Sequence, residues 1–394
     1  MNIVHYQHVM NLSAGGTTRT TTDVGTILNE RGHEVTVITY DDTDVPDSWR
    51  QGDPGQPRVV RIDPPRPPLG RFARSTMKQV EPLVAEADVL HLHAPWDPPN
   101  PQFAAVARRT GTPYVLSLHG MLDEYSMRQR GLKKKLYMAL VGRKLLERAA
   151  CVHCDNETEA EQSHPWFPRG RTMVIPVILD LDLFEELPGP ELARLSFDDL
   201  PDASEADADA VVLFLSRVQE KKGIEVLIDA TERLRDRDVR CRVIVAGDAE
   251  VPGYDAQLMA DIARRGLDDR IRFVGLVGGP KKLSLYEAAD VFALPTRQES
   301  FGIVFAESLA CRTPVITTRG VHIWPQLEES GGALIVERTA DAFADAIVTL
   351  LEAGPPRRRE MGEMGRAWVF EYLGMDRVAG LYETLYRNAV GHRT

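Results

Sequence analysis

The stretch Arg297-Gln-Glu-Ser-Phe-Gly-Ile-Val-Phe-Ala-Glu307 places two carboxylates, Glu299 and Glu307, eight residues apart across Gly302. An apolar run typical of a buried strand, Val291 to Leu294, precedes it, and a helical pattern over residues 301–311 follows. The first N–H groups of a helix have no partner within the helix, so they bind anions such as phosphate. The stretch therefore predicts a strand, a turn and a helix of an open α/β sheet, with a phosphate site near Gly302.

The spacing of the two glutamates fits a nucleotide diphosphate sugar. At ~1.5 Å rise per residue, Glu299 and Glu307 lie on the order of 10 Å apart, roughly the distance between the hexose and the ribose of such a molecule. Ionised carboxylates only accept hydrogen bonds, and the vicinal hydroxyls of both sugars donate them. The alternative is that both are surface residues that flank a helix, with Glu299 favoured near the helix dipole.

A basic loop follows a second apolar strand, Val211 to Leu215. Arg217 and Lys222 lie five residues apart in this loop, before a helical pattern that begins at Ile224. Open α/β sheets bind ligands at the carboxyl ends of their strands, where these cations would clamp a diphosphate and offset its charge as it leaves. On its own, a basic loop is more often a solvated turn.

In order and spacing, these features resemble the retaining glycosyltransferases of the GT-B fold, glycosyltransferase family 4, over nearly the whole chain. Further markers are Gly15-Gly16, Gly32-His33-Glu34-Val35, Ala246-Gly247-Asp248 and Phe273-Val274-Gly275. The resemblance implies an α/β protein with two doubly wound Rossmann-like domains. It also implies transfer of a sugar to an acceptor hydroxyl with retention of anomeric configuration. Two turns depart from the family pattern: Arg312 replaces a common glycine, and Val177-Ile178 replaces a frequent Asn-Gly.

Short apolar runs alternate with amphipathic segments along all 394 residues, which is the pattern of parallel sheets with crossover helices. The strand-like runs are 3–8, 34–39, 59–62, 89–93, 114–118, 151–153, 173–178, 211–215, 242–246, 272–274, 291–294, 315–317 and 333–336. We expect an N-terminal acceptor-binding domain at 1–184, an acidic linker at 185–210, a nucleotide-sugar-binding domain at 211–370 and a C-terminal helix at 371–394. The resemblance implies that this helix crosses back to the first domain and that reaction occurs between the domains.

The resemblance also assigns roles residue by residue. Arg217 and Lys222 would bind the diphosphate, Glu307 the ribose hydroxyls, and Glu299 the hydroxyls of the transferred sugar. His119 would touch the donor sugar, because it ends a strand-like run; a lone histidine is otherwise more often structural. The remaining donor-binding residues are Gly15 and Gly16 in the first loop, Val274, Gly275 and Leu276 beside the base, and Ser300, Phe301, Gly302 and Ile303 at the phosphate.

No metal or other cofactor is expected, because Arg217, Lys222 and a helix dipole can carry the phosphate charge. Asp207-Ala-Asp209 matches the D-x-D spacing of metal-dependent glycosyltransferases, but it lies in a polar acidic run rather than after a buried strand. Cys151-Val-His-Cys154 matches C-x-x-C but lacks the second ligand pair of a zinc site.

Composition argues against several classes of protein. The formal net charge of −11 disfavours binding of nucleic acid. The chain has no basic leader and no run of about 18 apolar residues, and its four cysteines are few, so we expect a cytoplasmic protein.

The segment 128–148 is basic, with leucines at helical spacing. It would suit peripheral contact with the inner membrane face. A solvated helix that packs its apolar side into the domain is the alternative.

The sequence thus predicts a retaining glycosyltransferase with a nucleotide-sugar donor and a carbohydrate, lipid-linked or small-molecule acceptor. Such an enzyme would build a glycan or a glycosylated metabolite. Two alternatives are another enzyme on the same fold, such as a nucleotide-sugar epimerase, and a non-catalytic module that binds nucleotide sugars. The combination of Arg217, Lys222, Glu299 and Glu307 disfavours the non-catalytic module.

Overall fold

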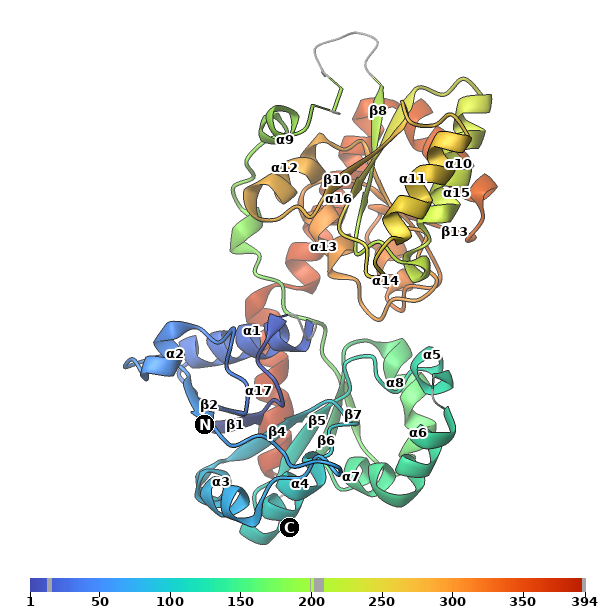
Figure 1. Ribbon diagram of the computed structural model, residues 1–394. Helices are drawn as coiled ribbons and strands as arrows, with labels where there is room; N and C mark the ends of the chain where they lie inside the picture. The colour runs from blue at the N-terminus through green and yellow to red at the C-terminus, as the bar shows by residue number, and fades with distance from the viewer. Residues whose placement is uncertain (13–15, 130, 199, 202–208, 392–394) are drawn as a thin grey trace. The chain divides into compact units, whose positions relative to one another are not determined.

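The structure is a computed structural model that describes residues 1–12, 16–129, 131–198, 200–201 and 209–391 (Figure 1). The chain divides into two compact units. Unit 1 comprises Met1–Leu179 and Met375–Thr394, and unit 2 comprises Asp180–Gly374. The boundaries expected from the sequence, after residue 184 and before residue 371, lie a few residues from these.

Unit 1 is built on a seven-stranded sheet of order β3-β2-β1-β4-β5-β6-β7, in which all neighbours are parallel. Its strands are β1 Asn2–Tyr6, β2 Glu34–Thr39, β3 Arg58–Arg61, β4 Val89–His93, β5 Tyr114–Ser117, β6 Cys151–Cys154 and β7 Thr172–Val174. Its helices are α1 Gly16–Glu30, α2 Asp47–Gln51, α3 Arg74–Glu86, α4 Asn100–Thr110, α5 Glu124–Arg128, α6 Gly131–Tyr137, the π-helical η2 Met138–Gly142, α7 Arg143–Glu147, α8 Glu157–Ser163, the 3-10 turn η3 His164–Trp166 and α17 Met375–Gly391.

Both faces of the unit 1 sheet are covered by apolar side chains, because its strands are buried on both sides. One cluster joins Leu90 and Leu116 to Phe103 of α4. The other joins Val115 to Leu28 of α1 and to Tyr382 of α17. The C-terminal helix α17 therefore packs with α1, β4 and β5 as part of unit 1 (Figure 1).

Unit 2 is a six-stranded parallel sheet of order β10-β9-β8-β11-β12-β13. Its strands are β8 Ala210–Leu215, β9 Cys241–Ala246, β10 Ile271–Gly275, β11 Val291–Ala293, β12 Val315–Thr318 and β13 Ala333–Val336. Its helices are the 3-10 turns η4 Asp182–Phe184 and η5 Glu220–Lys222, with α9 Glu191–Ser196, α10 Ile224–Asp236, α11 Tyr254–Arg264, α12 Gly279–Ala288, α13 Ile303–Ala310, α14 Trp324–Glu329, α15 Ala340–Glu352 and α16 Gly354–Tyr372.

Each sheet has one point at which its strand order reverses. In unit 1 this point lies between β1 and β4, and in unit 2 it lies between β8 and β11. Crossover helices leave in opposite directions there, so the carboxyl ends of these two strands border a crevice that open α/β sheets use for ligands. The two reversal points are where functional side chains are expected.

The segment 185–210 is not a simple linker, and this expectation from the acidic composition needs correction. Its helix α9 packs on α12, where the Ala193 N–H donates to Ser284 Oγ at 2.7 Å. The Gly189 N–H also donates to Glu287 at 2.7 Å. The buried Ala193 and the hydrogen bonds between the segment's backbone and the side chains of α12 dock this polar segment on unit 2.

Among the described residues, no helix is both long and apolar enough to cross a membrane.

Candidate functional site

Two loops meet at the reversal point of unit 2, one after β8 and one after β11. The Arg297 N–H donates to the Lys221 carbonyl at 2.8 Å. Gly223 has a φ of 79°, and a Cβ there would collide with the backbone carbonyl of Pro295. Because only glycine allows this approach, the sequence Lys222-Gly223 fixes one loop against the other.

Lys222 and Glu299 form an ion pair across these two loops. Their side chains are 10% and 19% exposed, so the pair is largely shielded from water. The backbone of Glu299 is held on both sides, since its N–H donates to the Gly320 carbonyl and its carbonyl accepts from His322 N–H, each at 2.9 Å. Two residues predicted to serve different parts of a ligand are therefore in direct contact.

The helix that follows, α13, begins at Ile303 rather than at Phe301 as the pattern predicted. Gly302 precedes it with a φ of 74°, a left-handed conformation that ends the loop before the helix starts. A Cβ on Gly302 would lie 2.8 Å from Glu299 Cγ. Phe301 is buried, whereas Ser300 and Ile303 are partly exposed. The expected phosphate cradle thus lies beside the carboxylate of Glu299.

Glu307 lies on α13 and faces α12. Lys282 Nζ lies 2.6 Å from Glu307 Oε1, and the Tyr286 hydroxyl donates to Oε2 at 3.2 Å. Burial, together with the charge of Glu307, raises the pKa of Tyr286 well above its ordinary value, so the hydroxyl keeps its proton. Sequence analysis missed both partners. Their four-residue spacing marks one face of α12, but only the sheet topology shows which helix that face meets.

Arg217 extends from the same edge, with 71% of its side chain exposed and an ion pair to Glu250 at 3.4 Å. The loop after β9, together with α11 and the end of β10, forms a pocket of about 390 Å³ lined by residues that include Gly247, Asp248 and Gly275. Of the residues expected near a base, Gly275 lines this pocket, Val274 is partly buried in β10, and Leu276 is 78% exposed.

In unit 1, His119 follows β5 with a φ of 54° and turns both ring nitrogens into the unit. Its Nε2 lies 3.0 Å from His93 Nδ1, and its Nδ1 lies 3.7 Å from Asp155 Oδ2. Burial alone would raise the pKa of Asp155, but the hydrogen bond and charge of His119 bring it below the ordinary value. The predicted contact of His119 with a sugar stays a prediction.

Other sequence features have plain structural settings. Gly16 opens α1, while Gly15 and Asp207 lie outside the described residues. Asp209 lies 3.2 Å from Arg240 Nε. Cys151 is buried on β6, and burial raises the pKa of its thiol to about 11. The thiol is therefore protonated at neutral pH.

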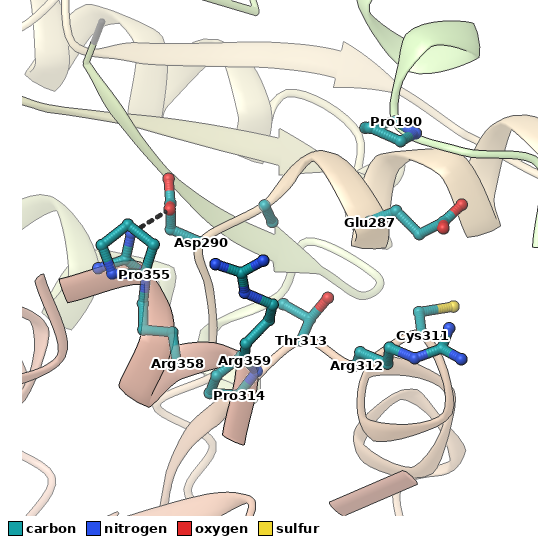
Figure 2. A pocket seen from close by; sticks show the side chains of 11 residues that line it. Pro190, Glu287, Asp290, Cys311, Arg312, Thr313, Pro314, Pro355, Arg358 and Arg359 are labelled. Carbon is teal, nitrogen blue, oxygen red and sulfur yellow. Dashed lines mark hydrogen bonds and ion pairs between the residues drawn. The ribbon is translucent and has the colours of Figure 1, made fainter. Parts of the chain in front are cut away.

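A second pocket of unit 2, about 280 Å³, was not predicted (Figure 2). It lies at the amino ends of strands β11 and β12, whereas the loops described above follow the carboxyl ends of the strands. Asp290 and Pro314, which precede β11 and β12, line it together with Arg358, which pairs with Asp290 at 2.7 Å. Arg312, the residue that departs from the family pattern, also lines it and has a φ of 65°.

Comparison with known families finds matches in both halves of the chain. A family model described as "Glycosyl transferase 4-like domain" matches residues 15–177, and one described as "Glycosyl transferases group 1" matches residues 197–368. The chain is 31% identical over 340 residues to a D-inositol 3-phosphate glycosyltransferase of Nocardiopsis dassonvillei, covering 78% of this chain and 74% of that protein. The corresponding protein of Corynebacterium aurimucosum is 37% identical over 158 residues, which span only 37% of its length and 39% of this chain.

Solved structures with the same fold include Alr3699/HepE of Anabaena. Its complex with UDP matches with a TM-score of 0.78 at 21% identity, over 98% of this chain and 99% of that chain. Its complex with UDP-glucose gives 0.74 at 20% identity, over the same shares of both chains. The similarity therefore extends over both units.

Proposed function

This chain belongs to the glycosyltransferases of the GT-B fold, and from that membership we propose that it transfers a sugar from a nucleoside diphosphate to an acceptor hydroxyl. We further propose that the anomeric configuration is retained and that the protein supplies the charge stabilisation without a metal. The observation that carries the proposal is the ion pair of Lys222 and Glu299 at the reversal point of the unit 2 sheet, beside Gly302.

The ion pair holds both side chains in place to bind a nucleotide-sugar donor. An ammonium group has three N–H donors, so Lys222 can hold Glu299 and still donate to a diphosphate. Glu299, fixed through its backbone and its charge, then accepts from the hydroxyls of the sugar. As the bond to the sugar breaks, negative charge grows on the diphosphate, and Lys222, Arg217 and the first N–H groups of α13 offset it.

The ribose would bind at Glu307. Lys282 and Tyr286 use one hydrogen bond each to the carboxylate, whose two oxygens offer about four acceptor sites. The remaining sites can accept from two vicinal hydroxyls while the two partners hold the side chain still. The base would bind in the pocket beside Gly275, and the cavity there supports this proposal. Support for a nucleotide-sugar donor comes from HepE, which was solved with UDP-glucose.

Unit 1 would bind the acceptor, in the cytoplasm, with peripheral contact to a membrane as a further proposal. Leu132, Leu136 and Leu140 lie at four-residue spacing and are 86%, 59% and 65% exposed. Lysines adjoin them, and the neighbouring pocket of about 740 Å³ is lined by Trp96 and Tyr137 among others. Exposed leucines beside cations suit an anionic lipid surface and hence a lipid-linked acceptor.

A turnover assay tests the proposal. The full chain is incubated with uridine, guanosine, adenosine, cytidine and thymidine diphosphate sugars, with and without simple acceptors, and released nucleoside diphosphate is measured before and after chelation of metals. We expect release from one nucleotide family, unchanged by the chelator. NMR of the product should show the anomeric configuration of the donor. Binding without any release would contradict catalysis, and loss of release on chelation would contradict the metal-free proposal.

A further inference from the structure

A layer of histidines crosses one face of the unit 1 sheet where its strand order reverses, between β1 and β4. His5 pairs in register with His91, and Ser117 pairs with His93 and with His153. Because alternate residues of a strand share a face, His91 and His93 lie on the same side of the sheet. The four rings are at most 3% exposed. Because these imidazoles are buried, their hydrogen bonds determine which nitrogen of each ring carries the hydrogen.

One set of hydrogen bonds, which we call the anchored row, has a fixed direction. His153 Nε2 lies 2.9 Å from the Ile175 carbonyl, which only accepts, so this nitrogen carries the hydrogen. His153 Nδ1 accepts from Ser117 Oγ at 2.6 Å, and Ser117 accepts from His91 Nε2 at 2.7 Å. His91 Nδ1 accepts from the Tyr386 hydroxyl at 2.8 Å. Burial lowers the pKa of both imidazoles and raises that of Tyr386, which keeps this row neutral.

The second set, which we call the open row, joins His5, His93 and His119. His5 Nδ1 lies 3.0 Å from His93 Nε2, and His93 Nδ1 lies 3.0 Å from His119 Nε2. In both pairs the ring centroids are 5.3 Å apart and the planes differ by 19° and 5°, so the rings meet edge to edge as N–H···N bonding requires. The open row thus forms one line of hydrogen bonds across three segments of the chain.

The two ends of the open row differ. His119 Nδ1 faces the carboxylate of Asp155, while His5 Nε2 is buried and, within the described part of the chain, has no hydrogen-bond partner. A carboxylate only accepts, so in the neutral row each ring carries its hydrogen on Nδ1, directed toward Asp155. Among the residues that the structure describes, no carbonyl fixes that direction as Ile175 does in the anchored row.

We propose that His5 and His93 are positioning residues for His119. When the charge of His119 changes, the hydrogens on His5 and His93 move together from one ring nitrogen to the other along the open row. The proposal rests on the proposed function, in which His119 contacts the donor sugar. When the row takes up one proton from solvent, His119 carries hydrogens on both nitrogens beside Asp155. His93 and His5 then carry theirs on Nε2. Three ring hydrogens become four, and both N···N hydrogen bonds are kept with reversed direction.

The surroundings place the added charge at His119. His153 of β6 and Asp155, the residue that follows β6, face it, and Tyr382 faces the layer from α17. Glu159 of α8 accepts hydrogen bonds from the N–H of Gly120 at 2.5 Å and from the N–H of Asp155 at 2.7 Å. Burial, and after it the charge of Asp155, raises the pKa of Glu159 well above the ordinary value. Burial lowers the pKa of His5 to about 3 and that of His93 well below its usual range. Asp155 is therefore the carboxylate that can hold an imidazolium.

A metal is the other occupant that the layer could take. His5, His91 and His93 offer ring nitrogens that lie within 4.8 Å of one another. However, both nitrogens of His91 and of His93 already make hydrogen bonds, and a shared ion would require these to break. The edge-to-edge geometry thus favours a row of N–H···N bonds over three rings that converge on an ion.

NMR of the full chain labelled with ¹⁵N-histidine tests the proposal, because ring nitrogen shifts distinguish N–H from bare nitrogen. As the pH is lowered over the range in which the chain stays folded, we expect the signals of His5 and His93 to exchange Nδ1–H for Nε2–H together with the appearance of the second hydrogen on His119. His91 and His153 of the anchored row should keep one tautomer throughout, which provides the control within the same sample.

Two variants sharpen the test. In His5→Leu the signals of His93 should no longer follow those of His119, because the ring that accepts the reversed bond is gone. In His5→Gln, whose amide both donates and accepts, the coupling should return. The acid side of the turnover profile should shift by about one pH unit in His5→Leu and be restored in His5→Gln.

Other outcomes overturn the proposal. These are a change at His119 while His5 and His93 keep their tautomers, the absence of any change in the open row, or one equivalent of metal that shifts all three cluster rings. Coupled exchange in a protein that turns over no nucleotide sugar would leave the row established and contradict the proposed function instead.

Discussion

The reversal points of the two sheets hold their polar side chains in different ways. In unit 1 the polar groups are neutral imidazoles inside the strands, as with His5 and His91, under a covering helix. In unit 2 the two strands at the reversal point, β8 and β11, are apolar to their ends, and the polar groups are ion pairs in the loops and helices that follow, as with Lys222 and Glu299. This contrast underlies our proposals that one sheet edge controls protons and that the other offsets charge.

The difference shows that the position of a polar side chain, inside a strand or in the loop after it, determines whether the side chain can be charged. A charge inside a buried strand has no water and few partners, so burial keeps the imidazoles of unit 1 neutral. A charge in a loop at the strand end can find a partner and still reach a ligand, as the 10% exposure of the Lys222 side chain indicates. The predictions below test this contrast.

The largest effect is expected for Lys222→Ala, which removes a cation from the unit 2 edge. Loss of one group that stabilises developing charge commonly lowers turnover by about 10² to 10³. The measurement is kcat with the preferred donor. Lys221→Ala, a truncation of the neighbouring lysine, is the control and should stay within about threefold of the wild type. Equal losses in both variants would contradict a specific role for Lys222.

The imidazoles of unit 1 should make that unit sensitive to mild acid. His5, His91 and His93 have lowered pKa values in the folded protein, so the unfolded chain takes up protons first as pH falls below about 6.5. Their stabilisation is complete above that pH and is lost toward pH 3, by about 1.4 kcal/mol per pH unit for each ring that stays neutral.

Hydrogen exchange between about pH 7 and pH 5, corrected for intrinsic rates, measures this loss. The protection of β1 and β4 amides should fall faster than that of β8 and β11, since unit 2 contains one histidine, His322. The same pH dependence in both units would show that the layer is not the cause.

Gly302→Ala should disturb the close packing between the start of α13 and Glu299. The new Cβ would lie 2.5 Å from Phe305 Cε2 and 2.8 Å from Glu299 Cγ, and the alanine would have to adopt a left-handed backbone conformation. We expect a destabilisation of about 1 to 3 kcal/mol in urea unfolding, together with weaker donor binding. Gly266→Ala is the matched control, because Gly266 has a φ of 63° but no atom lies within 4 Å of the new Cβ. If Gly266→Ala weakens the protein as much, conformational strain alone explains the loss.

The smallest effect is expected at the exposed leucines of unit 1. Leu132→Ser should reduce flotation of the protein with anionic vesicles by a few fold, corresponding to about 1 kcal/mol of lost burial. Leu195→Ser in unit 2 is the control, since Leu195 is also 86% exposed. Flotation that is absent in the wild type, or reduced equally by both changes, would remove the proposed membrane contact.

The sequence predicted the fold because parallel strands buried on both faces form continuous apolar runs. All 13 strands found among the described residues overlap with predicted runs, and Glu34–Thr39, Val89–His93 and Ala333–Val336 match to the residue. The GT-B fold expected from the resemblance is confirmed by the solved structures. The predicted start of α13 was wrong by two residues because Gly302 adopts a left-handed conformation just before the helix, and a helical pattern of apolar residues does not encode that conformation.

The partners within the sites were less predictable. Lys222 and Glu299 could be named from motifs, but their ion pair depends on how the loops after β8 and β11 meet. Lys282 was missed because an ordinary lysine on an amphipathic helix carries no signal of its target. The histidine layer was missed because His5, His91 and His153 lie far apart in sequence, and only strand register brings them together.

Binding of nucleoside diphosphate sugars to the wild type and to Glu307→Ala tests the central claim most directly. Thermal unfolding is measured with five nucleotide families, and Glu352→Ala, an exposed glutamate of unit 2, is the control. At 100-fold excess over Kd, a ligand stabilises the native state by about 2.7 kcal/mol. The account predicts a shift with one family in the wild type and in Glu352→Ala, and its loss in Glu307→Ala. No shift with any family, or an undiminished shift in Glu307→Ala, would contradict it.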